Sequence, residues 1–297
     1  VLLLVGALLP LLGVLGDPFG RLVGSDLGDV YKHAWSYWHT PHSLATWPWT
    51  EAFNAPAGGF LWDVMLAPSL LFAPVTAVFG PAFATNLWVF FSLLLVGVCS
   101  GALARELGAG KLESGVVGFL AQGAPYLYGY PLLSGVHERL AIWIFPLLVI
   151  CMLRLRDGAG RRWWILGCVA YAFVAAGCGV YGIWSLLLVG LTLPVVRSSG
   201  RFLWGLSPQV PLLIGLGCIS LLLLMGMQIA SGPDSLSPQP DRFSMWGVQW
   251  HMTFSDASLA ELFWPPHVRA AQGIDSGDLL WEQSFVGWTQ LGICLVG

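Results

Sequence analysis

The chain has 297 residues, of which 56% are hydrophobic and only 10% are charged, and its formal net charge at pH 7 is -3. Soluble domains carry about 25% charged residues, so this composition excludes an ordinary soluble globular class. No basic face is present for nucleic acid, and the six cysteines lie in apolar segments without the spacing of a disulfide framework or a zinc site. The apolar residues form long uncharged runs, and about 20 such residues span a bilayer as a helix. We therefore predict an all-α fold, a polytopic transmembrane helical bundle.

The predicted spans follow one another along the whole chain. The first covers residues 1–16, and a polar, aromatic stretch covers 17–63. Residues 64–80 are apolar but short and contain prolines, so we expect them to lie at the membrane without crossing it. Residues 231–283 form a second long polar stretch before a last apolar run. The remaining predicted spans are about 84–104, 114–133, 140–153, 163–178, 181–196 and 207–230.

This pattern predicts one transmembrane domain over residues 1–297, with outer loops at about 17–80 and 231–283. The chain begins and ends inside apolar runs, so we expect a fragment truncated at both ends. A signal peptide over residues 1–16 is the alternative to a truncated first span.

Loop charges predict the orientation, because cytoplasmic loops carry an excess of Lys and Arg. If 64–80 does not cross, one set of loops holds eight basic and three acidic residues, and the other holds five basic and 13 acidic residues. The clusters 154–162 and 197–201 are then cytoplasmic, and all six histidines lie on the other side. The spans hold no Asp, Glu, Lys, Arg or His, which argues against an ion-coupled transporter.

The first outer loop carries two acids close to a histidine. If the segment forms a helix from about residue 27, Asp26 lies near its N-cap. Asp29 then lies one turn before His33, on the same face of the helix. Asp29 is a candidate general base toward a hydroxyl acceptor. The alternative is helix capping, since first-turn acids satisfy free N–H groups and the helix dipole.

The same loop is rich in Trp and Tyr, including Trp35 and Trp38. Such residues settle at membrane interfaces, because one end of the side chain is apolar and the other is polar. The alternative is a stacking surface for sugar rings.

A short outer turn at 134–140 carries His137 and Glu138. One interpretation is that both are polar side chains that extend toward water at a helix end. The alternative is that they bind an anionic headgroup or a metal together with residues of the first loop. No established catalytic or nucleotide-binding motif is present, and metal-ligand spacing is absent from the sequence.

The order of these motifs resembles the GT-C superfamily of membrane glycosyltransferases, and most closely its poorly characterised bacterial GT-C-like members. The resemblance rests on the early acidic motif SDLGDVYKHAW at 25–35 and the apolar segment at 66–110. It also rests on the histidine turn SGVHERLAIWIFPLLV at 134–149 and on EQSFVGWTQLG at 282–292. One departure is that the adjacent acid pair of the best-known members appears here as Asp26 and Asp29, three residues apart.

The resemblance implies a GT-C-like bundle whose long first outer loop carries interfacial helices. It implies an integral protein of the bacterial inner (plasma) membrane, active on its non-cytoplasmic face, with membrane lipids and a polyprenyl-phosphate sugar donor as partners. It further implies inverting transfer of the sugar, with Asp29 as the catalytic base and Asp26 as a second catalytic candidate. The expected substrate-binding residues are His33, His137, Glu138, Trp35, Trp38 and Glu282.

Metal use varies within that superfamily, so a divalent metal cofactor stays open and no metal ligands are assigned. The alternative function is a transporter or flippase for a lipid-linked glycan or another amphiphile. A third is a membrane assembly or scaffold protein.

Overall fold

The computed structural model describes most of the N-terminal two thirds of the chain. Within that part the protein is helical, apart from two antiparallel strands of two residues each, β1 (Trp49–Thr50) and β2 (Gly59–Phe60). The all-α prediction is therefore confirmed. The described residues are 1–24, 30–45, 49–50, 59–60, 65–133, 135–157, 161–196 and 215–219.

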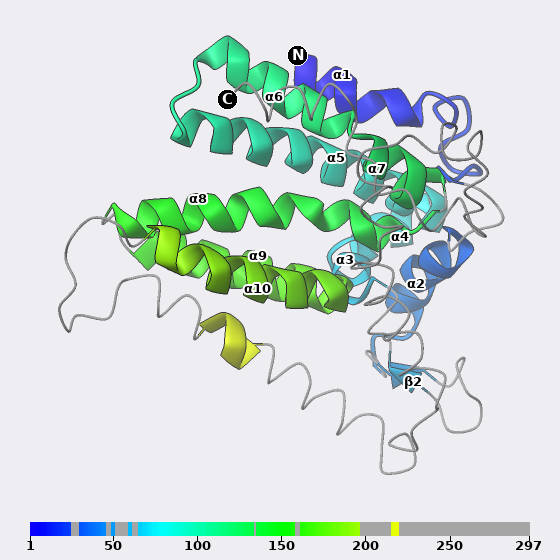
Figure 1. Cartoon of the computed structure of the whole chain (residues 1–297). Coiled ribbons are helices and arrows are strands. Elements are labelled where there is room, and N and C mark those ends of the chain that lie inside the picture. Colours follow the sequence, from blue (N-terminus) through cyan, green and yellow to red (C-terminus); the bar gives the residue numbers. More distant parts are fainter. Residues whose placement is uncertain are drawn as a thin grey trace, which may run out of the picture.

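One set of helices lies side by side as a bundle, and the others gather at one end of it (Figure 1). The bundle consists of α1 (Leu2–Leu8), α5 (Pro81–Glu106), α6 (Lys111–Gln122), α8 (Ile144–Arg156), α9 (Arg161–Gly177) and α10 (Gly179–Val196). The end is formed by α2 (Val30–His42), α3 (Leu66–Leu71), α4 (Ala73–Phe79), α7 (Pro125–Leu127), the π-helical turn η2 (Tyr128–Leu133) and the 3-10 helix η3 (His137–Trp143).

Helix α5 is the central element of the bundle. It has 26 residues, so it is about 39 Å long at 1.5 Å per residue. Among the described residues it is the one helix that is both long and apolar enough to cross a membrane.

Several predicted spans coincide with helices, and others do not. The predicted 84–104, 163–178 and 181–196 match α5, α9 and α10 to within three residues at each end. The prediction for 114–133 was wrong in extent: α6 ends at Gln122, because Gly123 and the prolines at 125 and 131 interrupt a regular helix. Of the predicted 207–230, the structure describes only residues 215–219, which are helical.

Proline also shortens the two apolar segments nearest the N-terminus. The predicted span 1–16 is α-helical only to Leu8, and a 3-10 turn, η1 (Leu9–Leu11), follows around Pro10. Residues 66–79 form two helices that meet at Phe72, just before Pro74. Helices of six and seven residues are far shorter than the about 20 residues of a span. Their geometry agrees with a segment that does not cross, and their place relative to a membrane stays a prediction.

Helices α5 and α6 pack with their backbones in close contact. A Cβ atom built on Gly118 would lie 2.3 Å from the carbonyl oxygen of Gly97, and one on Gly101 would lie 2.6 Å from that of Ser114. Small residues stand four positions apart on both helices, at 97 and 101 and at 114 and 118. This spacing allows the close approach and is also found in close-packed transmembrane pairs. Gln122 Nε2 extends the contact, donating to the carbonyls of Leu93 (3.0 Å) and Leu3 (2.9 Å).

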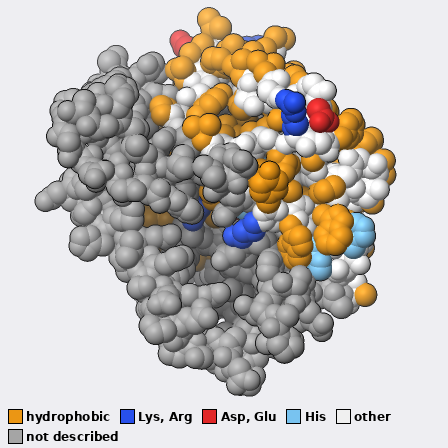
Figure 2. Space-filling view, turned by 90° about the vertical axis from the view of Figure 1, so that its right-hand side faces the viewer, with side chains coloured by type: hydrophobic (Ala, Val, Ile, Leu, Met, Phe, Trp, Pro, Cys, Tyr) orange, Lys and Arg blue, Asp and Glu red, His pale blue; other side chains and the backbone are white. Residues whose placement is uncertain are grey.

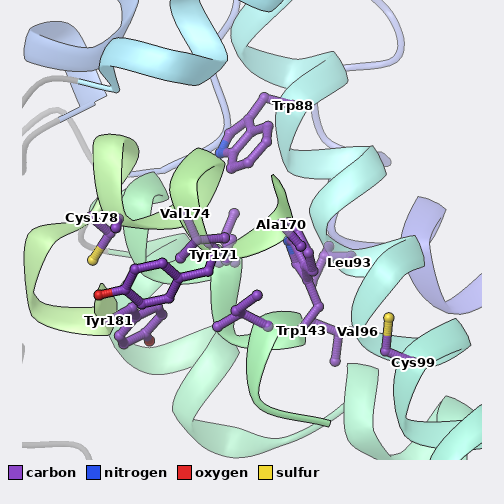
Figure 3. Close-up of a cluster of buried hydrophobic side chains, with 14 of the residues drawn as sticks. Trp88, Leu93, Val96, Cys99, Trp143, Ala170, Tyr171, Val174, Cys178 and Tyr181 are labelled. Atoms are coloured by element: carbon purple, nitrogen blue, oxygen red, sulfur yellow. The ribbon is translucent and has the colours of Figure 1, made fainter. Parts of the chain in front are cut away.

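The core lies between α5, η3 and α8 and continues between α8, α9 and α10. Figure 3 shows Trp88, Leu93 and Val96 of α5 opposite Tyr171 and Val174 of α9. Each of these side chains is buried.

The two ends of the bundle differ in chemistry. At one end, which we call the basic end, α5 and α8 finish and α6 and α9 begin (Figure 1). These helix ends carry Arg105, Lys111, Arg154, Arg156, Arg161 and Arg162. The opposite end, formed by α2, α3, α4 and η3, carries the described histidines, and we call it the histidine end.

Candidate functional site

The site begins with a loop that α5 holds in place. Asn86, near the start of α5, accepts a hydrogen bond from the Val23 amide (3.1 Å). Its own amide group donates to the carbonyls of Arg21 (2.7 Å) and Pro18 (3.2 Å). Asn86 is buried, so these bonds replace contacts with water and fix residues 18–23 against the bundle.

Two glycines bring the first loop against the later histidine turn. Gly24 and Gly135 both have positive φ angles, +123° and +66°, which residues with a Cβ rarely adopt. A Cβ on Gly24 would lie 3.0 Å from the Cα of Gly135. A Cβ on Gly135 would lie 2.9 Å from the backbone nitrogen of Val30, the first residue of α2. The start of α2 therefore packs directly on the turn that leads into η3.

Three side chains meet at this junction, and we call them the His–Glu cluster: His33, His137 and Glu138. His33 Nε2 lies 2.6 Å from Glu138 Oε2, and the His33 side chain is fully buried while that of Glu138 is 13% exposed. The rings of His33 and His137 stack with centroids 5.8 Å apart and an interplanar angle of 28°. The indole N–H of Trp88 donates to the carbonyl of His137 (3.1 Å), which ties η3 to α5.

The cluster holds two of its groups in defined protonation states. Burial alone would raise the pKa of Glu138, but the charge and contact of His33, with a smaller effect of Lys32, lower it to about 2. Burial lowers the pKa of His137 to about 3; a charge on His33 acts the same way, and Glu138 and the backbone of Val23 offset part of the effect. At neutral pH the cluster therefore presents an ionised carboxylate beside a neutral imidazole.

Glu138 also lines a small recess between α3, α5, η3 and α9. The recess has an empty volume of about 160 Å³, open solvent included. One wall residue, Met65, has a φ of +64°, an uncommon conformation for a residue with a side chain. Glu138 supplies the one charged wall, and the other lining residues are Met65, Pro68, Trp88, Ala141, Phe173, Val174 and Gly177. In this structure the recess is too narrow to hold even a water molecule, so it places Glu138 at the wall of a shallow depression.

The two tryptophans that the sequence grouped with this site lie elsewhere on α2. Trp35 stacks on His39 with centroids 4.6 Å apart, and Trp38 stacks on His42 at 5.0 Å. At about 100° per residue, Trp38 points about 140° around the helix from His33. Trp38 is exposed, and histidine and hydrophobic side chains lie together on the surface at this end (Figure 2). The structure thus separates Trp35 and Trp38 from the His–Glu cluster.

The remaining candidates, Asp26, Asp29 and Glu282, lie outside the described residues. Asp29 directly precedes Val30 in the chain, and Val30 packs on Gly135. Of the residues that position the site, sequence reasoning missed Asn86, Trp88 and Met65. Asn86 could have been found, because it is a strongly polar residue near the start of a long apolar run.

Within the described ranges, no group of three or more His, Cys, Asp or Glu side chains is arranged to hold a metal ion. Cys99, Cys151, Cys168, Cys178 and Cys218 form no disulfide within the described ranges. A scan against protein-family models finds no match to the chain, and a search of curated proteins finds no significant match.

Proposed function

We propose that the chain is a polytopic integral membrane protein of the bacterial inner membrane, with α1, α5, α6, α8, α9 and α10 lying in the bilayer. Large apolar side chains on the outside of these helices are exposed, which fits contact with lipid. Hydrophobic side chains also cover much of the described surface in Figure 2. Examples are Leu4, Phe91, Val98, Val116, Val169 and Leu187.

The proposed orientation places the basic end in the cytoplasm and the histidine end outside. The charge bias supports it, because six of the eight basic residues counted from the sequence lie on the helix ends that meet at the basic end.

Site-directed labelling tests this topology. Leu44 at the histidine end and Leu112 at the basic end are 55% and 80% exposed, so a cysteine at either position can react. Both cysteine variants are made in a protein that also carries Cys218→Ser and Cys294→Ser. The first change removes an exposed thiol, and the second removes a thiol that lies outside the described residues. A membrane-impermeant maleimide applied to intact cells should label L44C, and L112C only after permeabilisation. The reverse pattern would overturn the orientation.

Within this membrane frame, the proposed activity is transfer of a sugar from polyprenyl phosphate at the outer face. One observation carries it: the start of α2, the helix that follows Asp29 in the sequence, packs on the turn before η3, and there His33 of α2 meets an ionised carboxylate and a second histidine. A cluster of titratable groups in which the pKa values of His137 and Glu138 are shifted favours a site for chemistry. The contact joins two of the segments on which the resemblance to GT-C enzymes rests, 25–35 and 134–149, which supports the proposal.

In the proposed reaction Asp29 accepts the proton of an acceptor hydroxyl. The oxygen attacks the anomeric carbon as the bond to phosphate breaks, polyprenyl phosphate leaves, and the configuration inverts. A carboxylate held ionised repels a phosphate. Glu138 is therefore assigned to the acceptor side of the site, where it can accept a hydrogen bond from a hydroxyl.

The discriminating substitution is Asp29→Asn. Asn caps a helix about as well as Asp, so a capping role predicts little change, whereas loss of a general base costs on the order of 10²–10⁴ in rate. The assay incubates purified full-length protein with polyprenyl-phosphate sugars and follows release or transfer of the sugar. Asp256→Asn, the same change at an outer-loop acid that is assigned to no site, is the matched control.

Each outcome decides between functions. Transfer by Asp29→Asn within about twofold of the parent protein would falsify the catalytic assignment. Movement of the lipid-linked sugar across vesicles without bond cleavage would instead support the alternative, a transporter or flippase for amphiphiles.

A further inference from the structure

The basic end concentrates positive charge on the ends of four helices. Arg105 ends α5, Lys111 begins α6, and Arg161 and Arg162 begin α9, and all four residues are exposed. Arg154 and Arg156 lie in the last turn of α8.

Internal contacts use only part of this charge. Arg154 Nη2 lies 2.5 Å from Glu106 Oε1, and Arg156 Nε lies 2.8 Å from Asp157 Oδ1. The third acid of this end, Glu113, instead accepts a hydrogen bond from the backbone amide of Gly110 at the start of α6. In the part of the chain that the structure describes, the other four basic side chains form no ion pair with a carboxylate. We call Arg105, Lys111, Arg161 and Arg162 the basic patch.

Apolar and aromatic side chains lie among these charges. Leu107 and Leu112 flank the turn between α5 and α6 and are 71% and 80% exposed. The guanidinium groups of Arg154 and Arg162 lie 5.7 and 5.9 Å from the ring centroid of Trp163. Exposed leucines beside a tryptophan and unneutralised cations are the composition of a surface that sits at the boundary of acyl chains and headgroups.

We propose that the basic patch binds the headgroups of anionic phospholipids in the cytoplasmic leaflet. The occupant follows from charge complementarity: the patch offers four cations, and the leaflet it would face carries negative lipid. Leu107 and Leu112 insert beside the same lipids, and the Arg–Trp contacts hold the first turn of α9 at that level. This inference rests on the membrane embedding proposed above but not on the glycosyltransferase activity.

The test measures lipid selectivity of the full-length protein. The protein in detergent is titrated with phosphatidylglycerol or phosphatidylcholine, and retained lipid is counted by native mass spectrometry. The parent should prefer phosphatidylglycerol. Each Arg→Gln change at 161 or 162 should reduce that preference about fivefold, which is the effect of one basic residue near an anionic surface. The double variant should reduce it about 25-fold.

Arg21→Gln is the matched control, because it makes the same change of charge at the exposed histidine end and should leave the preference within about twofold. Raising ionic strength from about 0.1 to 1 M shortens the screening length from about 10 to 3 Å and should abolish the preference of the parent. A parent without preference, or an equal loss in Arg21→Gln, overturns the proposal. Release of the protein from membranes by alkaline carbonate would overturn the membrane embedding itself, so the two failures are distinguishable.

Discussion

Replacing Gly118 by alanine tests the close contact between α5 and α6. The new Cβ would lie 2.3 Å from the carbonyl oxygen of Gly97 and 3.0 Å from a methyl group of Leu3. The first of these neighbours is backbone, so it cannot rotate away, and the two helices must separate.

The magnitude follows from two opposing effects. Overfilling a packed site costs about 1–3 kcal/mol. Removing a glycine from the interior of a helix returns roughly 0.5–1 kcal/mol. Gly115 lies on the same helix with nothing within 4 Å of its Cβ position, so Gly115→Ala shows the second effect alone. The difference in free energy of unfolding between the two variants should therefore be about 1–3 kcal/mol, with Gly118→Ala the less stable.

The assay is reversible unfolding of the full-length protein in mixed micelles, followed by circular dichroism as the fraction of denaturing detergent increases. Both variants are measured beside the parent. If Gly118→Ala is as stable as Gly115→Ala, α5 and α6 do not approach as closely as the structure shows, and the reasoning fails.

Two further predictions concern the site. Stability should fall on acidification. The pKa of His137 is about 3 in the folded protein against the ordinary 6.5, so below pH 6.5 the unfolded chain binds a proton that the folded protein does not. Glu138, with a pKa of about 2 against 4.5, contributes stability that is present above pH 4.5 and is lost toward pH 2. The melting temperature, measured between pH 3 and 8, should therefore fall toward low pH. In Glu138→Gln this fall should be smaller at the acidic end of the range. An equal fall in that variant would contradict the lowered pKa of Glu138. Asn86→Leu removes the partners of Val23, Pro18 and Arg21 and should cost about 1–3 kcal/mol. Hydrogen exchange at the Val23 amide should accelerate, and unchanged protection would show that the loop is held by other contacts.

Much of the helix order could be predicted from the sequence, because long uncharged runs leave few alternatives. The limits of α5, α9 and α10 follow from the charges and glycines that flank their apolar runs. The interruption after Gln122 was harder to predict, since the run stays apolar through Pro125 and Pro131 and only backbone chemistry ends the helix.

The site was predictable in part. His33, His137 and Glu138 were chosen from their places in two separate loops, and the structure brings these three together. Their pairing could not be read from spacing, because it depends on how α2 and η3 pack through Gly24 and Gly135. Trp35 and Trp38 share the loop with His33 but not its face of α2, a distinction that requires the start of the helix to be known. The roles of Asp26, Asp29 and Glu282 stay predictions.

The contact between His33 and Glu138 also constrains how the protein is made. The two residues are separated by 105 positions in the chain. Since synthesis proceeds at about 5–20 residues per second, His33 leaves the ribosome roughly 5–20 s before its partner. During that interval α5 and α6 are synthesised, and α2 has nothing at Gly135 to pack against. The histidine end is thus assembled only after the α5 and α6 segments have been synthesised, and a nascent chain that stalls before η3 lacks the partner of His33.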